Sequence, residues 1–344
     1  MRRIVIHRPG SFERLTIESF TLAEPAPSHV RIAVRAIGIN FADCIIRMGL
    51  YASAKELVGW PITPGFEVAG EIEAVGSDVT DLKVGDRVIG VTLFNGYATH
   101  LDLKHEQVFL MPADWSFAAA AGFPTVFLTA WWALFELAHP RPGARILVHS
   151  AAGGVGQALC QLGKIAQCEV AGVVGGAHKV AAAQAAGAHE VIDKSSTDLW
   201  HAARRFAPKG FDVVLDANGA ETLKASYQYL GGGGKLVIYG FHTMFSRGGA
   251  GKPNWLKLGY DWLRTPRFDP MKLTEDNKSV LAFNLSFIGE RVDALRQAMR
   301  ELLDWGTGGR VQPLPVTPYP FEQVAQAHRD IESGRTTGKL VLTL

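Results

Sequence analysis

Cysteine is scarce in this sequence. The chain has 344 residues and only three cysteines, Cys44, Cys160 and Cys168. Three cysteines cannot form a disulfide framework, and no two of them stand in a CxxC pair that would suggest a redox or zinc motif. The pattern favours a reducing compartment, and we therefore expect a cytoplasmic protein.

Net charge and long apolar runs are also lacking. The 35 Lys and Arg residues and the 33 Asp and Glu residues leave a net charge of +2. A chain without one dominant sign of charge is unlike a nucleic-acid-binding protein. The sequence has no uncharged apolar run of about 18 residues, and its first apolar run is too short for a signal peptide.

The chain is long enough for two domains, and its pattern changes near residue 123. Before this point, short segments rich in Val and Ile alternate with turn residues and predict a barrel-like β domain over residues 1–122. After it, helices separate expected strands at 145–150, 170–174, 189–193, 212–217, 235–240 and 279–287. This alternation predicts right-handed βαβ units and a parallel sheet.

Two segments near the C-terminus complete the predicted architecture. Residues 290–305 have the apolar spacing of an amphipathic helix, and residues 339–344 read as a strand. Because the last segment is β-like, we expect the C-terminal tail to return to the first domain.

A glycine-rich loop follows the first strand of the predicted α/β domain. It has the sequence AAGGVG and comprises Ala151, Ala152, Gly153, Gly154, Val155 and Gly156. Small residues in a strand–loop–helix context let a dinucleotide pyrophosphate approach the helix N-terminus. Ala151 replaces the first glycine of the usual fingerprint, so a plain tight turn is the alternative interpretation.

The residues after the second strand of this domain indicate which dinucleotide binds. An NAD site carries an acidic residue there for the ribose 2′-hydroxyl, whereas this chain has Gly175 and Gly176. Lys179 and Lys194 lie nearby in sequence and favour a 2′-phosphate, hence NADPH. The alternative is that both lysines are ordinary solvated side chains.

Several motifs in chain order resemble the medium-chain dehydrogenase/reductase superfamily, and within it the quinone oxidoreductase branch. They are GINFAD (38–43), RMGLY (47–51), TPGFEVAGEIEAVG (63–76), LKVGDRV (82–88), HSAAGGVGQ (149–157) and TTGKLVL (336–342). Residues 252–287 further resemble the vesicle amine transport protein-like subgroup. The resemblance covers essentially the whole chain.

The resemblance implies the class and the boundaries of the fold. It implies an α/β protein with a Rossmann parallel-sheet cofactor domain and a GroES-like β-barrel catalytic domain. We expect the GroES-like domain over residues 1–122 and 289–344, and the NADPH-binding Rossmann domain over residues 123–288.

The zinc ligands of related enzymes are missing from this sequence. Zinc-dependent members have Cys where this chain has Asn40, His where it has Phe66, and a further Cys near residues 124–126. Residues 77–122 contain no cysteine for a structural zinc lobe, and Glu67 alone cannot make a site. His100 and His105 are interpreted as surface or capping residues, so no metal is expected.

The resemblance also implies which side chains form the active site. It places Asn40 and Tyr51 as catalytic residues beside the nicotinamide and substrate, with Asn40 also contacting the cofactor. To the cofactor residues already named after the strands, Gly176, Lys179 and Lys194, the resemblance adds Thr129, Phe241, Asn284 and Lys339. The alternatives are that Asn40 satisfies a turn, that Tyr51 packs a loop and that Thr129 caps a helix. Asp43 is expected to be a structural anchor, and Cys44 a buried, inert thiol.

Two further segments suggest partners. Residues 242–273 are basic and rich in Trp and Leu, which predicts either a helix that touches a membrane or, as we favour, a cover for the cleft or a dimer contact. Residues 279–287 are expected at a sheet edge, where pairing with a second copy would give a homodimer.

Together these features predict an NADPH-dependent, zinc-independent reductase of quinones or α,β-unsaturated carbonyl compounds (enones). Without a Lewis acid, alcohol oxidation is disfavoured, whereas a conjugated acceptor spreads the charge of the incoming hydride. The alternative is an NADPH-binding, membrane-associated scaffold protein with little catalytic activity. The sequence does not identify the physiological substrate.

Overall fold

The computed structural model describes residues 1–245, 251–288 and 291–344. Among these residues the chain forms two compact units. The first contains residues 1–125, 251–252, 286–288 and 291–344, and the second contains residues 126–245 and 253–285. Three predictions fall partly outside the described residues. They concern the basic segment 242–273, the start of the predicted helix 290–305, and residue 289, where the second part of the predicted GroES-like domain begins.

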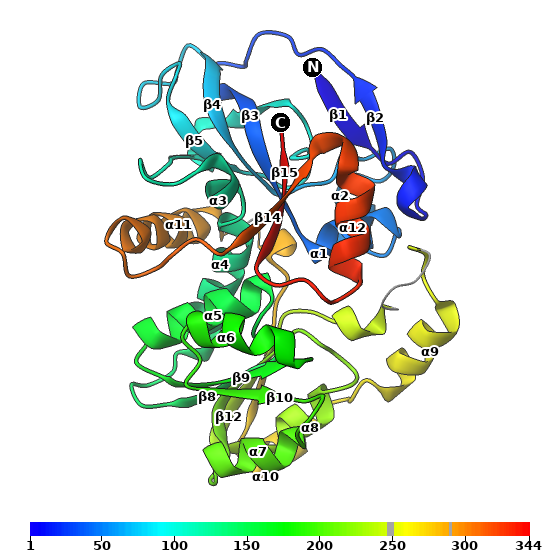
Figure 1. The fold of residues 1–344 in the computed structure, drawn as a ribbon, viewed down its shortest axis with the longest axis vertical. Coiled ribbons are helices and arrows are strands. Elements are labelled where there is room, and N and C mark those ends of the chain that lie inside the picture. The colour runs from blue at the N-terminus through cyan, green and yellow to red at the C-terminus, as the bar shows by residue number, and fades with distance from the viewer. Residues whose placement is uncertain (246–250, 289–290) are drawn as a thin grey trace. The chain divides into compact units, whose positions relative to one another are not determined.

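A seven-stranded sheet forms the body of the first unit (Figure 1). Its order is β14 (Val316–Pro320), β15 (Lys339–Thr343), β3 (His29–Ile39), β4 (Glu67–Val75), β5 (Arg87–Val91) and β7 (Val108–Leu110), with β6 (His100–Lys104) also paired to β3. A separate antiparallel pair joins β1 (Arg2–Val5) and β2 (Thr16–Ser19). The pairing of β15 with β3 confirms the predicted return of the C-terminal strand.

Short helices connect and cover these strands. They are α1 (Phe41–Arg47), α2 (Ala52–Leu57), α3 (Phe117–Ala121), α11 (Val292–Thr307), α12 (Val324–Glu332), and the 3-10 turns η1 (Phe12–Arg14), η2 (His105–Gln107), η6 (Leu285–Phe287) and η8 (Phe321–Gln323). The side chains that point inward from β3, β4 and β15 pack with Phe321 and Val324 in a core of buried residues. The β-branched residues of these strands suit this half-buried surface.

A six-stranded, all-parallel sheet forms the second unit. Its order is β10 (Glu190–Asp193), β9 (Glu169–Val174), β8 (Arg145–Val148), β11 (Phe211–Asp216), β12 (Leu230–Ile238) and β13 (Ser279–Ala282). The chain order reverses between β8 and β11, which is the switch point where doubly wound folds bind ligands. The predicted Rossmann parallel sheet and the α/β class are confirmed.

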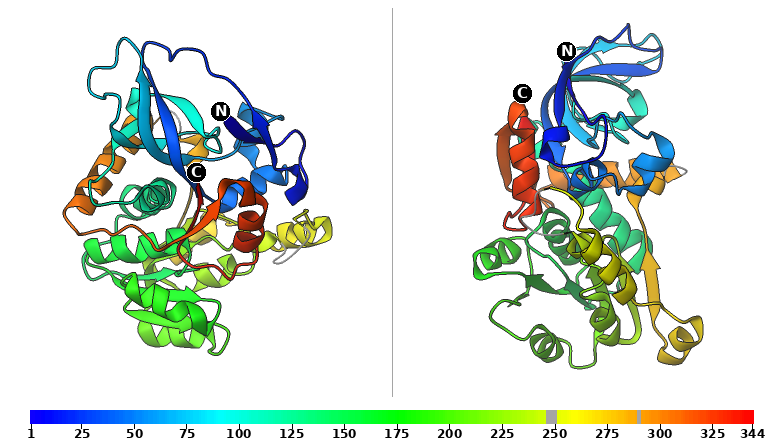
Figure 2. Two further views of the ribbon diagram at one scale, coloured as in Figure 1. Left: turned by 45° about the horizontal axis from the view of Figure 1, so that its top comes forward. Right: turned by 90° about the vertical axis from the view of Figure 1, so that its right-hand side faces the viewer.

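Helices lie on both sides of this sheet. In Figure 1, α5 (Gly154–Ile165) and α6 (Val180–Ala185) lie on one side, and α7 (Leu199–Phe206) and α8 (Leu223–Gln228) on the other. The remaining elements are η3 (Trp132–Ala138), η4 (Ala177–Lys179), η5 (His242–Met244), α9 (Trp255–Arg264) and α10 (Pro270–Asp276). Helix α4 (Pro124–Trp131) contains the boundary between the two units. Figure 2 gives two further views of these elements.

The predicted strand 279–287 is wrong beyond its first four residues. Strand β13 ends at Ala282, and the 3-10 turn η6 follows at Leu285. The neighbouring strand β12 ends at Ile238, whose carbonyl accepts the N–H of Phe283 at 3.2 Å. Because β12 ends there, the chain has no strand on which to continue the ladder.

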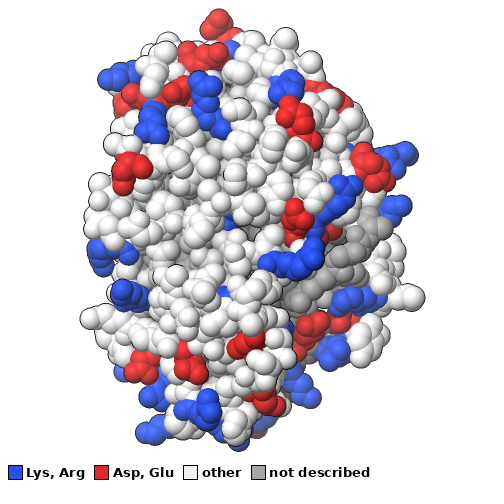
Figure 3. All heavy atoms as spheres, in the orientation of Figure 1, with Lys and Arg blue, Asp and Glu red and all other residues white. Residues whose placement is uncertain are grey.

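The described surface agrees with the small net charge. On the face drawn in Figure 3, Lys and Arg side chains alternate with Asp and Glu side chains. None of the helices formed by the described residues combines the length and the apolar character that crossing a bilayer requires.

Gly156 controls how closely α5 approaches β8 and the loop after it. A Cβ atom at this position would lie 2.3 Å from the carbonyl oxygen of Ser150 and 2.7 Å from the Cα of Ala151. Both neighbours are backbone atoms, so the clash cannot be relieved by a side-chain rotation. The close packing of helix on loop therefore requires glycine.

We predict that Gly156→Ala lowers the free energy of unfolding by about 1–3 kcal/mol, because the helix must move away from the loop. Gly232→Ala is the matched control, since a Cβ there meets nothing within 4 Å. Urea unfolding followed by circular dichroism measures both. Equal midpoints for the two variants would show that α5 does not depend on this contact.

Candidate functional site

The carboxylate of Glu67 is the centre of a buried polar cluster in the first unit. It accepts hydrogen bonds from Asn40 Nδ2 at 2.9 Å, from Lys339 Nζ at 2.7 Å and from the backbone N–H of Thr125 at 2.7 Å. The side chain of Glu67 is fully buried. A buried carboxylate needs such partners, because an unpaired charge away from water is costly.

The register of three neighbouring strands brings these residues together. Asn40 directly follows β3, whereas Glu67 and Lys339 are the first residues of β4 and β15. Because β3 runs antiparallel to both neighbours, its end lies beside their beginnings. Sequence reasoning named Asn40 and Lys339 as site residues but did not predict that they touch.

Two glycines leave room for the cluster. A Cβ at Gly38 would lie 2.4 Å from Glu67 Oε1, and a Cβ at Gly122 would lie 2.8 Å from Lys339 Cγ. Larger residues at these positions would displace the carboxylate or the lysine stem. The cluster therefore depends on Gly38 in the GINFAD motif and on Gly122, which directly follows α3.

Tyr51 lies at the start of α2, with its hydroxyl 2.7 Å from Ser286 Oγ. Its ring packs edge-on against Phe66, with ring centroids 6.1 Å apart. Tyr51 is half-buried. Its ring packs on the apolar side chain of Phe66, and its hydroxyl pairs with the hydroxyl of Ser286. The sequence resemblance placed the backbone of residues 284–286 near the cofactor, but the contact between Ser286 and Tyr51 was not predicted.

The residues at the expected zinc positions do not fit a zinc ion. The ring of Phe66 is buried in an apolar cluster with Ile46, Ile62 and Phe94. The amide of Asn40 is hydrogen bonded to Glu67 and, through Oδ1, to the Lys339 ammonium at 2.5 Å. A catalytic zinc needs three strong donors and an open position, whereas here the positive charge beside Glu67 is the ammonium of Lys339.

A second buried network anchors α1. The carboxyl group of Asp43 accepts from the backbone N–H groups of Asn40 and Gly65 at 2.8 and 3.1 Å and from the Tyr97 hydroxyl at 3.1 Å. Burial raises the pKa of Asp43 to about 7. These contacts confirm Asp43 as a structural anchor, and they fix the backbone from which the Asn40 side chain extends.

Cys44, His328 and Glu332 form the one group of potential metal ligands found among the described residues. Glu332 pairs with the buried guanidinium of Arg47, and His328 bridges Cys44 at 3.5 Å and Tyr97 at 3.1 Å. Burial raises the pKa of the Cys44 thiol and lowers the pKa of His328. The expectation of a buried thiol is confirmed, and the charge of Glu332 is already balanced by Arg47.

The predicted phosphate loop lies in the second unit, between β8 and α5. Its turn is closed by hydrogen bonds from Gly153 N–H to Ser150 O and from Ala151 N–H to Val173 O, both at 2.9 Å. Helix α5 begins at Gly154, and its N-cap Gly153 has no side chain to cap the first turn. The N–H groups of that turn therefore suit an external anion, so the residues present fit a dinucleotide pyrophosphate.

Most of the other predicted cofactor residues follow the carboxyl ends of the parallel strands, at the same edge as this loop. Gly176 and Lys179 come after β9, Lys194 after β10, Phe241 after β12 and Asn284 after β13. The backbone N–H of Lys194 bonds to Val174 O at 3.1 Å, which places it beside the end of β9. All of these residues lie in the second unit.

Thr129 is the exception, because it comes from a helix. It is the sixth residue of α4, so the alternative that it caps a helix is wrong. Asn40, Tyr51 and Lys339 belong to the first unit, and the other predicted site residues belong to the second.

Sequence reasoning missed a buried cluster beneath the phosphate loop. Asp216 accepts hydrogen bonds from the hydroxyls of Thr222 at 2.7 Å and Ser226 at 2.8 Å. The Ser226 hydroxyl also lies 3.0 Å from His149 Nε2. The signal available was an acidic residue at the end of an apolar strand, DVVLD. Burial lowers the pKa of His149, the residue that directly follows β8.

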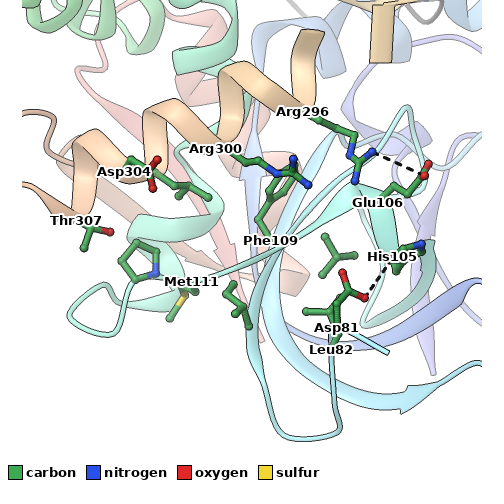
Figure 4. Close-up of a pocket in the computed structure, with 14 residues that line it drawn as sticks. Asp81, Leu82, His105, Glu106, Phe109, Met111, Arg296, Arg300, Asp304 and Thr307 are labelled. Carbon is green, nitrogen blue, oxygen red and sulfur yellow. Dashed lines mark hydrogen bonds and ion pairs between the residues drawn. The ribbon is translucent and has the colours of Figure 1, made fainter. Parts of the chain in front are cut away.

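A hollow of about 430 Å³ lies elsewhere in the first unit, between β7 and one face of α11 (Figure 4). Within it, Arg296 lies 3.8 Å from Glu106, and His105 lies 3.2 Å from Asp81. The charges of its lining are mixed, and the predicted site residues do not line it. His105 thus pairs with an exposed carboxylate, in line with its interpretation as a surface residue.

Comparison with known proteins places these features in a family. Residues 26–138 match the family described as alcohol dehydrogenase GroES-like domain, and residues 186–342 match the family described as zinc-binding dehydrogenase. A Danio rerio synaptic vesicle membrane protein VAT-1 homolog is 33% identical over 344 residues, covering 99% of this chain and 70% of the relative.

Solved structures show the same relationship. Escherichia coli quinone oxidoreductase, solved in complex with NADPH, superposes with a TM-score of 0.86 at 29% identity, and the match covers 100% of both chains. The enoyl reductase CurK gives a TM-score of 0.85 at 28% identity over 99% of both chains.

The fold and the site define a two-domain dehydrogenase/reductase with a Rossmann and a GroES-like part. The chain belongs to the medium-chain dehydrogenase/reductase superfamily of oxidoreductases, in its quinone oxidoreductase branch and close to the VAT-1 homologues. The resemblance inferred from the sequence motifs is confirmed.

The buried carboxyl group of Asp43 predicts how stability depends on pH. Its pKa is about 7 in the folded chain, against an ordinary value of 3.8, so between these limits the folded state binds one more proton than the unfolded state. The free energy of unfolding contributed by this group therefore falls as pH rises through that window. Asp43→Asn removes the titration and should flatten this part of the profile.

Urea unfolding at pH 5 and pH 8 measures the effect. The Asp43→Asn variant also loses hydrogen bonds, so it is expected to be less stable at both pH values, and the informative quantity is the change between them. Burial also lowers the pKa of His328, a group that the substitution leaves in place. An identical change with pH in wild type and variant would contradict the raised pKa.

Proposed function

We propose that this protein is an NADPH-dependent reductase that transfers hydride to quinones or enones without a zinc ion. The observation that carries the proposal is the uncapped first turn of α5 in the loop of residues 151–156, at the switch point of a parallel sheet. We assign cofactor binding to the domain 123–288, and catalysis to the GroES-like domain of residues 1–122 and 289–344.

The end of β9 supports NADPH over NADH. The residues that follow this strand are Gly175, Gly176 and Ala177, so the strand does not end in the acidic residue that binds the ribose 2′-hydroxyl in NAD sites. In our proposal Lys179 and Lys194 bind the 2′-phosphate from the ends of β9 and β10. Ala151, Gly153, Gly154, Val155 and Gly156 form the pyrophosphate loop, and Thr129, Phe241 and Asn284 contact the rest of the dinucleotide.

The first unit supplies the groups that bind the acceptor. NADPH, when bound, supplies the hydride. Asn40 retains one Nδ2–H beyond the hydrogen bond to Glu67, and this N–H donates to the carbonyl oxygen of the acceptor, where negative charge develops. Tyr51 orients the same oxygen or delivers its proton. This chemistry needs mainly proximity and orientation, because the conjugated acceptor delocalises the added charge.

One exposed apolar surface, on helix α9, supports the alternative of a membrane-associated scaffold protein. Helix α9 exposes Leu256 by 88% and Leu263 by 75% of their surface, and Trp255 and Trp262 are also exposed. Such a face suits a membrane or a partner, but it explains neither the polar cluster at Asn40 nor the phosphate loop. We therefore propose the reductase as the function, with NADPH binding but no turnover as the result that would favour the scaffold.

A titration of cofactor binding, followed by nicotinamide fluorescence, tests the proposal. We predict a clear preference for NADPH over NADH. In Lys179→Ala, NADPH affinity should fall roughly tenfold while NADH affinity changes little, because only the 2′-phosphate contact is lost. Lys224→Ala, on α8, is the control.

The outcomes separate the parts of this proposal. Equal affinity for the two dinucleotides would contradict the assignment of the lysines. If neither NADPH nor NADH bound, the loop of residues 151–156 would be an ordinary turn, and the proposed function would be wrong. Binding followed by oxidation of NADPH with a quinone such as menadione, or with an enone, would support it.

We also propose that the protein forms a homodimer through β13. This strand is one edge of the six-stranded sheet, and no other strand of the described residues pairs with its outer side. Pairing with its copy across a two-fold axis would continue the sheet and remove the edge.

The dimer proposal predicts that Ala282→Lys lowers the mass in solution from two chains to one. Ala282 is exposed at the end of β13, and a lysine there would place a charge in the sheet edge that the second copy has to cover. Light scattering after size exclusion measures the mass, with Gln297→Lys on α11 as control. A monomeric wild type, or a variant that stays dimeric, would refute this interface.

A further inference from the structure

Lys339 is the most constrained charged side chain of the cluster around Glu67. Only 3% of its surface is exposed, and its ammonium bonds to Glu67 Oε1 at 2.7 Å and to Asn40 Oδ1 at 2.5 Å. Its stem passes over Gly122, where a Cβ would meet Lys339 Cγ at 2.8 Å. A lysine buried to this degree is held by its partners, because lost hydration must be replaced.

The two partners of Asn40 also decide which way its amide points. An asparagine side chain can exchange its oxygen and nitrogen by a half-turn. Here the half-turn would aim an N–H at the Lys339 ammonium and the carbonyl oxygen at the Glu67 carboxylate. Both contacts would be repulsive, so the pair permits one orientation.

Among the described residues, this orientation leaves one donor of the Asn40 amide without a partner. Nδ2 carries two hydrogens, and Glu67 accepts one of them at 2.9 Å. Since the charges of Lys339 and Glu67 balance, the cluster presents a fixed N–H donor without adding net charge to the site. Preorganised donors of this kind stabilise developing negative charge without reorganisation.

We propose that Lys339 is a positioning residue: together with Glu67 it fixes the Asn40 amide so that the free Nδ2–H meets the acceptor oxygen of the substrate. The inference deepens the proposed reductase function and rests on it. Lys339 acts through Asn40 and does not itself touch the reacting atoms.

A double-mutant cycle on kcat tests this coupling. With menadione as acceptor, Asn40→Ala should lower kcat roughly a hundredfold and Lys339→Met roughly tenfold, with small changes in the KM for NADPH. The double variant should be no slower than Asn40→Ala, because Lys339 has nothing left to position. If the fold losses in kcat of the two single variants multiply in the double variant, the proposal is wrong.

Control variants separate positioning from folding. Lys339→Gln keeps a donor nitrogen and should recover part of the lost kcat, which a purely structural role would not predict. Lys235→Met removes another half-buried lysine, whose Nζ donates to Ala138 O at 2.6 Å in the second unit, and should leave kcat unchanged. Lys339→Gln no faster than Lys339→Met would count against the proposal.

A second readout does not need turnover. The side-chain amide protons of Asn40, assigned by their loss in Asn40→Ala, should exchange slowly in NMR spectra of the whole protein and faster in Lys339→Met. Unchanged amide signals in Lys339→Met would overturn the role of Lys339. If instead the signals respond but neither menadione nor an enone is reduced, the amide is fixed as described and the proposed function is what fails.

Discussion

The burial of Glu67 is the constraint on which the first unit depends. A carboxylate with no access to water needs a counter-charge and several donors, and here they come from three separate places in the chain. Lys339 at the start of β15, Asn40 before α1 and the N–H of Thr125 in the first turn of α4 all converge on it. The burial of Glu67 therefore holds the start of the C-terminal strand in place, and it also holds Asn40, the residue that we assign to catalysis.

The same principle recurs nearby. Glu332 is buried beside Arg47, and Asp43 is buried among backbone N–H groups and Tyr97. For Glu332 as for Glu67, the balancing positive charge is a side chain of the protein. Together with Phe66 in its apolar cluster, these pairs account for the side chains that surround Asn40.

Much of this could be predicted from local pattern. The alternation of strands and helices after residue 123, the small residues of the phosphate loop and the β-like C-terminus each identify an element that the structure contains. The pairing of Lys339 with Glu67, and of Arg47 with Glu332, could not be predicted, because each depends on the tertiary register of distant segments. The same holds for β13, whose length is set by the end of β12 and not by its own apolar run.

The most direct test of the account is to follow the hydride itself. With NADPH that carries deuterium at both C4 positions of the nicotinamide and an enone as acceptor, the account predicts deuterium at the β-carbon of the product. With unlabelled NADPH, it predicts the same rate before and after treatment with a zinc chelator. Product without deuterium, or activity that is lost on chelation and restored by zinc, would contradict direct transfer at a metal-free site.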